Sequence, residues 1–304
     1  MENNITLAPI CLFVYSRLDE TKITIESLQK NYLSSKSQLF IFSDGAKNND
    51  ILAQVQEVRE YIHSINGFAE VTIYESELHK GLANSIISGI TKIVNIYQRV
   101  IVLEDDLILA TNFLCFMNQA LTYYEENKRI LSISGYSFRI KYPKNYNYDV
   151  AFSLRASSWG WATWKDRWEV IDWEVGSYKS FQFNLIKRLK FNRGGSDMSH
   201  MLDKQKSGKI NSWAIRFCYH QYKNNLIDVF PTISKVTNNG FGENATHSRV
   251  GSFRFRTKLD SSNKQHFNLQ KEINVSIPIL LQFYSHYSIF MRTIAKIMDF
   301  SIKK

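Results

Sequence analysis

Short apolar runs alternate with amphipathic segments of helical length along the first half of the chain. The apolar runs predict strands at 9–15, 38–42 and 69–74 and a fourth strand that ends at Glu104, whereas the intervening segments predict helices at 21–32, 51–65, 82–97 and 112–126. Strands separated by helices of this length are typical of βαβ units with right-handed crossovers. We therefore expect an α/β fold in which helices cover both faces of a mostly parallel sheet.

The second half of the chain is less regular. It predicts strands at 130–134, 150–154 and 229–236, a basic helix at 185–190 and a longer helix at 211–223. Pro231 lies inside the last of these strands and indicates an edge strand, because proline cannot donate to a neighbouring strand. The pattern changes near residue 150, but no linker separates the halves, which favours one continuous core over two independent domains.

Residues 277–304 have a different character, with many large apolar side chains interspersed with Arg292, Lys296, Lys303 and Lys304. A basic amphipathic helix of this kind can lie in a membrane interface. It can equally dock on the core of the protein or on a partner chain, so both interpretations stay open.

Composition and charge narrow the class of protein. The 304 residues are 44% hydrophobic, and the net charge of +10 favours an anionic partner such as a nucleotide, a nucleic acid or an acidic membrane surface. The cysteines, Cys11, Cys115 and Cys218, are far apart, which indicates a reducing compartment. The polar start Met-Glu-Asn-Asn does not resemble a secretory signal, and no uninterrupted apolar stretch is long enough for a transmembrane helix. We expect a cytoplasmic protein.

The most informative stretch is 99–109, where a buried strand is followed at once by Glu104, Asp105 and Asp106. Three adjacent carboxylates at the end of a buried strand are costly unless a cation or a positive group sits there. Their hard oxygen atoms suit Mg²⁺ or Mn²⁺, which commonly share carboxylates with substrate phosphates. The stretch predicts a metal–diphosphate site, and a solvated acidic loop is the alternative.

Other polar residues follow the predicted strands or open the next helix, where open α/β sheets bind their ligands. Arg17 can pair with phosphate and Tyr15 can stack on a base. Asp44 can accept from a base imide or a ribose hydroxyl, although an Asp-Gly pair is more often a turn. The segment from Lys80 to Asn84 begins the helix at 82–97, whose N-terminal amides favour anions. None of these glycine spacings matches a Walker or dinucleotide-binding fingerprint.

Taken together, Tyr-Ser-Arg at 15–17, Ser-Asp-Gly at 43–45, His-Lys-Gly-Leu-Ala-Asn at 79–84 and Val-Leu-Glu-Asp-Asp at 102–106 resemble a GT-A glycosyltransferase. The likeness is to the family 2 type and, in the Glu-Asp-Asp form of the DXD motif, to the N-acetylglucosaminyltransferase I group. The segments 158–164 and 238–247 resemble bacterial sugar transferases of surface-polysaccharide loci.

The resemblance covers roughly residues 8–250 and leaves the tail outside. It implies a Rossmann-like αβα sandwich over 1–250, with a nucleotide-sugar half at 1–150 and an acceptor half at 151–250, followed by a C-terminal extension at 251–304 with its basic amphipathic helix.

The resemblance also implies a nucleotide-sugar donor, most simply a UDP-sugar, with Mn²⁺ or Mg²⁺ bridging its diphosphate. Asp106 would be the direct metal ligand and His247 would lie against the metal or the pyrophosphate. Glu104 and Asp105 would contact the ribose, the sugar or a metal-bound water, and Asp44 would read the uracil. The further residues expected at the nucleotide are Tyr15, Arg17, Lys80 and Asn84.

An inverting transferase needs a carboxylate that deprotonates the acceptor hydroxyl. The acid expected beside Trp213 has no counterpart, because the segment 212–216 contains no carboxylate. We predict Asp197 as the base, with Asp166 and Glu243 as rivals; as an alternative, Asp197 simply caps the following helix.

Aromatic residues near 160 are candidates for sugar binding. Trp159 and Trp161 flank Gly160 and can offer flat platforms to a sugar ring, whereas a buried aromatic cluster is the alternative. Arg155 could face the donor phosphates.

The sequence thus predicts a metal-dependent inverting glycosyltransferase that acts on a glycan or a lipid-linked glycan in surface polysaccharide synthesis. Peripheral contact with the inner face of the plasma membrane through the C-terminal helix is part of that prediction. A nucleotidyltransferase on a similar fold is the second interpretation. A basic nucleic-acid-binding or scaffold protein ranks last, because the positive charge is spread along the chain and no recognised nucleic-acid module is present.

Overall fold

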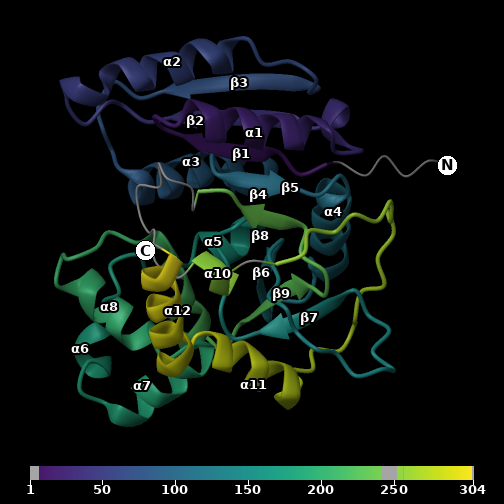
Figure 1. Ribbon diagram of the computed structural model, residues 1–304, viewed down its shortest axis with the longest axis vertical. Helices are drawn as coiled ribbons and strands as arrows, with labels where there is room; N and C mark the ends of the chain where they lie inside the picture. Colours follow the sequence, from purple (N-terminus) through teal and green to yellow (C-terminus); the bar gives the residue numbers. More distant parts are fainter. Residues whose placement is uncertain (1–6, 241–251, 256, 303–304) are drawn as a thin grey trace.

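The computed structural model describes residues 7–240, 252–255 and 257–302 and is built around one large sheet (Figure 1). The strands are β1 Ile10–Val14, β2 Gln38–Ser43, β3 Glu70–Glu75, β4 Arg99–Glu104, β5 Leu107–Leu109, β6 Ile130–Ser134, β7 Val150–Ser153, β8 Trp161–Trp164, β9 Ile227–Pro231 and β10 Val236–Asn238. Eight of them form the main sheet in the order β3-β2-β1-β4-β8-β6-β9-β7, and β10 pairs with β5 in a small second sheet.

The main sheet is mostly parallel. β3, β2, β1 and β4 pair in parallel, as do β6 and β9, whereas β8 and β7 run antiparallel to their neighbours. Strands from both sides of residue 150 therefore belong to the same sheet. The carboxyl ends of β1, β2, β4 and β6 lie at one edge, which is where an open α/β sheet binds its ligands.

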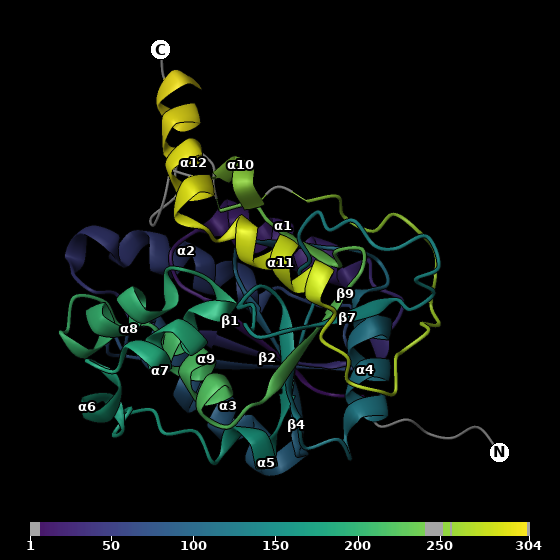
Figure 2. The ribbon, with the colours of Figure 1, turned by 90° about the horizontal axis from the view of Figure 1, so that it is seen from below.

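Helices connect the strands and cover the sheet (Figures 1 and 2). They are α1 Leu18–Gln29, α2 Leu52–His63, α3 Leu82–Tyr97, α4 Phe113–Tyr124, α5 Lys165–Trp168, α6 Tyr178–Phe181, α7 Leu185–Phe191, α8 Met198–Lys206, α9 Trp213–Lys223, α10 Ser252–Phe255, α11 Ile277–His286 and α12 Ile289–Ile302. Short 3-10 helices span Ser34–Lys36, Asn49–Ile51 and Asn192–Gly194.

The alternation of side chains along the strands produces two cores, one on each face. In β1, Leu12 packs with α1, α2 and α4 on one face, whereas Phe13 packs with α3 and α9 on the other. β4 repeats this pattern, with Leu103 facing the first core and Val102 the second. The predicted αβα sandwich with a mostly parallel sheet is therefore confirmed.

Two sequence predictions for the second half need correction. Pro231 was expected on an edge strand, but β9 lies between β6 and β7, and Pro231 is its last residue, paired with Val150. Proline is tolerated there because the ladder ends at that point. The predicted strand at 229–236 is in fact two strands, β9 and β10, which belong to different sheets.

The C-terminal segment forms two helices, as the predicted helical tail requires. α11 docks on the core, where Ile279, Phe283 and Tyr287 are buried. α12 follows and projects away from the body of the molecule (Figure 2), with Phe290 and Ile297 exposed. In the part of the chain that the structure describes, no helix combines the length and the apolar character that crossing a bilayer requires.

Candidate functional site

The acidic cluster lies at the carboxyl end of β4, at the edge shared with the neighbouring strands. Glu104 ends β4, and Asp105 and Asp106 form the turn into β5. Arg17 follows β1, which pairs with β4, and its Nη2 donates to a carboxylate oxygen of Asp105 and to Asp106 Oδ2 at 3.2 Å. Because the two strands are adjacent, residues 88 positions apart become an ion pair.

In the described part of the chain, the Arg17 guanidinium is the one positive group that pairs with this cluster of three carboxyl groups, so it does not balance their full negative charge. Burial and then the charges of Asp106 and Asp105 raise the pKa of Glu104 to about 8. Burial also raises the pKa of Asp105 to about 6, although Arg17 opposes the shift. Burial is the largest cause of both pKa shifts and the neighbouring carboxylates add to it, so a cation bound here would favour the ionised forms of Glu104 and Asp105.

The donor set fits a divalent cation that is shared with a ligand. Carboxylate oxygens are the atoms that Mg²⁺ and Mn²⁺ prefer. Among the described residues, no group of three His, Cys, Asp or Glu side chains is arranged to enclose an ion, so the protein alone does not form a complete cage. Asp106 would hold such an ion together with oxygen atoms from a bound diphosphate, with Glu104 nearby.

Asp106 is also held from the strand β10. Asn238 Nδ2 donates to Asp106 Oδ1 at 2.9 Å, and the main-chain N–H of Asn239 donates to the Asp106 carbonyl at 2.7 Å. Gly240 lies so close that a Cβ there would be 2.4 Å from Asp106 Oδ2. Sequence reasoning assigned no role to these three residues, although 238–240 lie in the Asn-Asn-Gly segment that carries part of the resemblance.

Asp44 directly follows β2 and is almost fully buried, at 7% exposure. Its Oδ1 accepts from the main-chain N–H groups of Gly45 at 3.0 Å and Lys80 at 2.9 Å. Its Oδ2 accepts from Gly81 N at 2.9 Å and lies 2.9 Å from His79 Nδ1. Four protein donors thus surround the carboxylate. In this state Asp44 fixes the loop before α3, a role that the predicted recognition of a base did not include.

The other residues expected at the nucleotide gather around that loop. The Tyr15 ring centroid lies 5.3 Å from that of His79, and its hydroxyl accepts from Lys47 N at 3.1 Å. Lys80 lines a cavity of about 280 Å³ together with Phe42, Asp44, Tyr74 and Lys92. Asn84 is exposed and donates to the Lys80 carbonyl at 2.9 Å.

A second cavity, of about 290 Å³, lies at the same end of the sheet as the acidic cluster. Its lining includes Ser157, Ser158 and Trp159. β8 runs antiparallel to β4 with Trp161 opposite Val102, so the segment before β8 leaves the sheet at the edge where β4 delivers its carboxylates. The remaining wall comes from the segments after β6 and β7, from α8 and α9, and from α10 and the end of α11. Its residues are Tyr136, Arg155, Ala156, Met198, Met201, Ser212, Ala214, Ile215, Cys218, Phe255 and Tyr287.

Arg155, expected at the donor phosphates, lines this cavity and pairs with Asp197. Its Nη1 donates to Asp197 Oδ1 at 2.7 Å and its Nη2 to Oδ2 at 3.2 Å. The guanidinium also stacks on the ring of Tyr287, with Cζ 3.8 Å from the centroid. Burial alone would raise the pKa of Asp197, but Arg155 outweighs it and the pKa is lowered. The carboxylate is therefore ionised and weakly basic.

The tryptophans divide between the cavity and the core. Trp159 lines the cavity, and its ring lies 4.6 Å from that of Tyr136. Trp161 is only 1% exposed and stacks on Trp213 in the core under α3 and α9, so it has no face to offer a sugar. The predicted sugar platform at Trp161 is therefore corrected.

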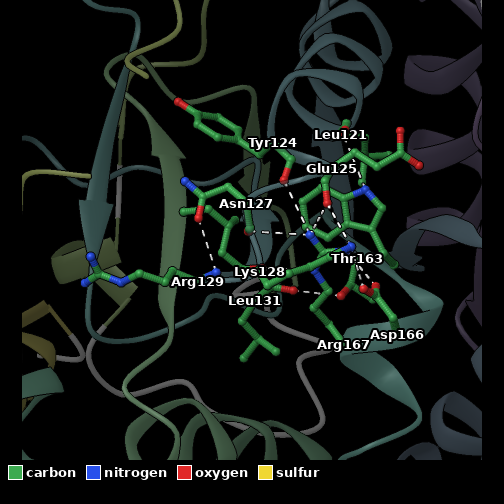
Figure 3. A network of polar contacts seen from close by, with 12 residues as sticks. Leu121, Tyr124, Glu125, Asn127, Lys128, Arg129, Leu131, Thr163, Asp166 and Arg167 are labelled. Atoms are coloured by element: carbon green, nitrogen blue, oxygen red, sulfur yellow. Dashed lines mark hydrogen bonds and ion pairs between the residues drawn. The ribbon is translucent and has the colours of Figure 1, made fainter. Parts of the chain in front are cut away.

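Asp166, a rival for the base, lies at the opposite edge of the sheet. Figure 3 shows it beside Arg167, which donates to main-chain carbonyls around the end of α4. Asp166 pairs with Lys128 at 2.8 Å and with Arg167 at 2.6 Å. Since Trp164 pairs with Arg99, the end of β8 that precedes Asp166 lies at the start of β4 and not at its acidic end. The other rival, Glu243, and the predicted metal neighbour His247 fall outside the described residues.

The residues that sequence reasoning missed come from distant segments. They are His79, Asn238, Gly240, Tyr136, Phe255 and Tyr287. His79 lay inside a quoted motif and could have been found by its place beside Lys80. No local signal marks the contact of Tyr287 with Arg155, because the two are joined only by the tertiary fold.

Comparisons with known proteins give fold neighbours only. No protein-family model matches the sequence, and no curated protein matches it. The mannosyltransferase PcManGT from Pyrobaculum calidifontis, solved with GDP-Man and Mn²⁺, is 9% identical over 72% of this chain and 71% of that chain, with a TM-score of 0.41. S. aureus TarS 1–349 is 9% identical over 82% of this chain, with a TM-score of 0.43. A further S. aureus TarS structure is 12% identical over 50% of this chain, with a TM-score of 0.33.

This chain spans 62% of the TarS 1–349 chain and 26% of the further TarS chain. At these identities and TM-scores, any functional assignment has to rest on the residues of the site itself.

Proposed function

We propose that this protein is a metal-dependent, inverting glycosyltransferase that moves a sugar from a nucleotide-sugar donor to a hydroxyl of a glycan or lipid-linked glycan. One observation carries the proposal: the Glu104–Asp106 cluster with Arg17 lies at the same sheet edge as an aromatic-walled cavity. A charge-deficient acidic cluster suits a cation and a diphosphate, and the adjoining aromatic and polar wall suits a sugar.

The donor would lie along the ends of β1, β2 and β4. Arg17, which pairs with Asp105 and Asp106, would also pair with a phosphate, and Tyr15 with the loop 79–81 would lie at the base and ribose. When bound, Mn²⁺ or Mg²⁺ would neutralise the leaving diphosphate, and Asp106 would hold the metal, with Glu104 and Asp105 at the ribose, the sugar or a metal-bound water. We keep a UDP-sugar as the proposed donor. Lys80 and Asn84 would lie at its nucleotide, and His247 would lie against the metal or the pyrophosphate.

The acceptor would enter the cavity walled by Trp159, Tyr136 and Tyr287. Arg155 lines this wall and binds Asp197, and the ion pair keeps the Asp197 carboxylate ionised, which is the form that a base requires. We therefore keep Asp197 as the proposed base, while Arg155 orients it and is not a donor ligand in this arrangement.

The proposed setting is the cytoplasmic face of the plasma membrane, where a lipid-linked acceptor would be presented. The exposed residues Phe290 and Ile297 of α12 support membrane contact by the C-terminal helix.

Calorimetric titration of UDP, GDP, CDP and dTDP, each with and without Mn²⁺, tests the donor site. We expect one nucleotide to bind tightly only when the metal is present, and Asp106→Asn to lose that dependence. Asp166→Asn is the matched control, because this carboxylate lies at the opposite edge of the sheet. Metal-independent binding, or equal binding by both variants, would remove the assignment. Release of pyrophosphate from a nucleoside triphosphate and a sugar phosphate would instead identify a nucleotidyltransferase.

A further inference from the structure

A second feature of the molecule lies away from the candidate site, on the short helix α7 and the residues before it. Four large apolar side chains are exposed to solvent there: Phe183 is 85% exposed, Leu185 74%, Ile186 66% and Leu189 70%. We call these four residues the α7 apolar face. Single exposed apolar residues are ordinary, but a contiguous group of this exposure indicates a binding surface.

The orientation of this face is fixed by buried residues on either side of it. Phe181 and Phe191 are almost completely buried in the core that also contains Leu202 of α8. Arg188 pairs with Asp203 at 2.7 Å, which ties the opposite side of α7 to α8. Leu185, Ile186 and Leu189 therefore cannot turn inward without withdrawing these anchors. Figure 1 shows α7 at the lower margin of the molecule, beyond the sheet and the other helices.

The segment that carries the α7 apolar face is basic throughout. The segment 179–193 contains five basic residues and no acidic one. Apart from Arg188, these are Lys179, Lys187, Lys190 and Arg193, and all four are exposed. Lys187 and Lys190 lie within α7 itself, next to the apolar positions.

We propose that the α7 apolar face, with its surrounding lysines and arginine, is a docking surface for an anionic lipid bilayer. A short helix with an apolar side and basic flanks lies in the interface, where the apolar side chains enter the acyl boundary and the cations meet acidic headgroups. The uniform positive charge selects the bilayer over a second copy of this chain, because two such faces would repel each other.

Docking of the α7 apolar face on a bilayer would also fix the orientation of the aromatic-walled cavity relative to the membrane. α7 leads directly through Asn192–Gly194 to Gly195, where a Cβ would lie 2.6 Å from Arg155 Nη1. The lipid-facing helix and the Arg155–Asp197 wall are thus joined by a short, tightly packed connection. The surface is independent of the proposed catalytic activity and would remain if that assignment failed.

Sedimentation of the full chain with vesicles tests the proposal. The wild-type protein should bind phosphatidylglycerol-containing vesicles and bind phosphatidylcholine vesicles weakly, with binding that falls as salt is raised. The double variant Leu185→Glu with Leu189→Glu should lower the partition coefficient at least about tenfold, because two apolar anchors are lost and two negative charges are added. Both positions are exposed, so the fold should persist, and circular dichroism checks this.

Two matched variants distinguish the α7 apolar face from exposed apolar residues elsewhere on the molecule. Ile96→Glu changes an equally exposed apolar residue of α3, at 63% exposure, and should bind vesicles like the wild type. Phe290→Glu changes α12, at 70% exposure, and should leave the contribution of α7 in place.

The proposal fails if the wild type does not bind anionic vesicles, or if the double variant binds as well as Ile96→Glu. It also fails if the wild type is a dimer in solution that the double variant converts to a monomer without any vesicle binding. In that case the α7 apolar face would be a protein interface.

Discussion

Replacing Asp44 with alanine separates two roles for this residue. If Asp44 mainly fixes the loop before α3, the substitution should destabilise the protein itself, even without any ligand. If it mainly reads a base, the loss should appear in nucleotide binding alone. The structure favours the first role, because four protein donors already surround the carboxylate.

The expected loss in the free energy of unfolding follows from those four contacts. A hydrogen bond to a charged group contributes about 1.5–3 kcal/mol when its loss leaves a buried donor unpaired. Lys80 and His79 lie near the surface, where water can replace the carboxylate, so the four contacts do not add in full. We expect Asp44→Ala to lower the free energy of unfolding by about 2–4 kcal/mol. Asp44→Asn keeps one acceptor oxygen and should lose about half as much.

Urea unfolding, followed by tryptophan fluorescence and circular dichroism, measures the effect. Glu77→Gln is the matched control in the same loop, since its side chain is exposed and its loss should change stability by less than about 0.5 kcal/mol. Coincident transitions by both probes are needed for the comparison to be valid. An Asp44→Ala variant as stable as this control, yet unable to bind any nucleotide, would refute the positioning role and restore the role in base recognition.

Three further substitutions test other parts of the site. In Gly240→Ala the new Cβ would meet Asp106 Oδ2 at 2.4 Å, so metal-dependent nucleotide affinity should fall about tenfold in calorimetry, with a stability change below about 1 kcal/mol. In Asp197→Asn the loss of stability should depend on pH. Arg155 lowers the pKa of Asp197 in the folded state, so the ion pair stabilises the protein above the unfolded pKa of about 4 and this contribution disappears as pH falls through the folded pKa. Urea midpoints of wild type and variant should therefore differ at pH 7 and converge in acid; a constant difference would contradict the ion-pair account. Trp161→Ala should cost about 3–5 kcal/mol in unfolding free energy because it empties a buried site, whereas an unchanged melting profile would show that this ring is not a core residue.

Local patterns predicted the regular parts of the fold well. The helix expected at 82–97 and the strand expected at 130–134 have the same bounds as α3 and β6, because each is a clear periodic or continuous apolar segment between breakers. β8 was not predicted as a strand, since its four residues, Trp161–Trp164, read as part of an aromatic cluster. The segment 229–236 was assigned to one strand because apolar periodicity does not show where a chain changes sheets.

In the candidate site, too, local patterns predicted some features, whereas others depend on the tertiary fold. Arg17 and the acidic cluster could be predicted together, because both follow strands of one parallel sheet and such strand ends share an edge. The sequence did not predict that protein donors would surround the Asp44 carboxylate. Three of its four contacts come from the loop 79–81 and depend on the path of that loop. The pairing of Arg155 with Asp197 could not be predicted either, since each residue had an equally reasonable role on its own.

The contact of Tyr287 with Arg155 has a consequence for the order in which the molecule is completed during synthesis. β1 to β4, with Arg17 and the acidic cluster, are made long before α11, whereas the cavity wall needs Tyr287, and Ser196 Oγ also donates to the Tyr287 carbonyl at 2.9 Å. A nascent chain would therefore acquire its acidic cluster first and close the wall of the neighbouring cavity only when α11 has left the ribosome. Changes to the C-terminal helices would accordingly reach the Arg155–Asp197 pair directly, so a tag or deletion there is a perturbation of the candidate site.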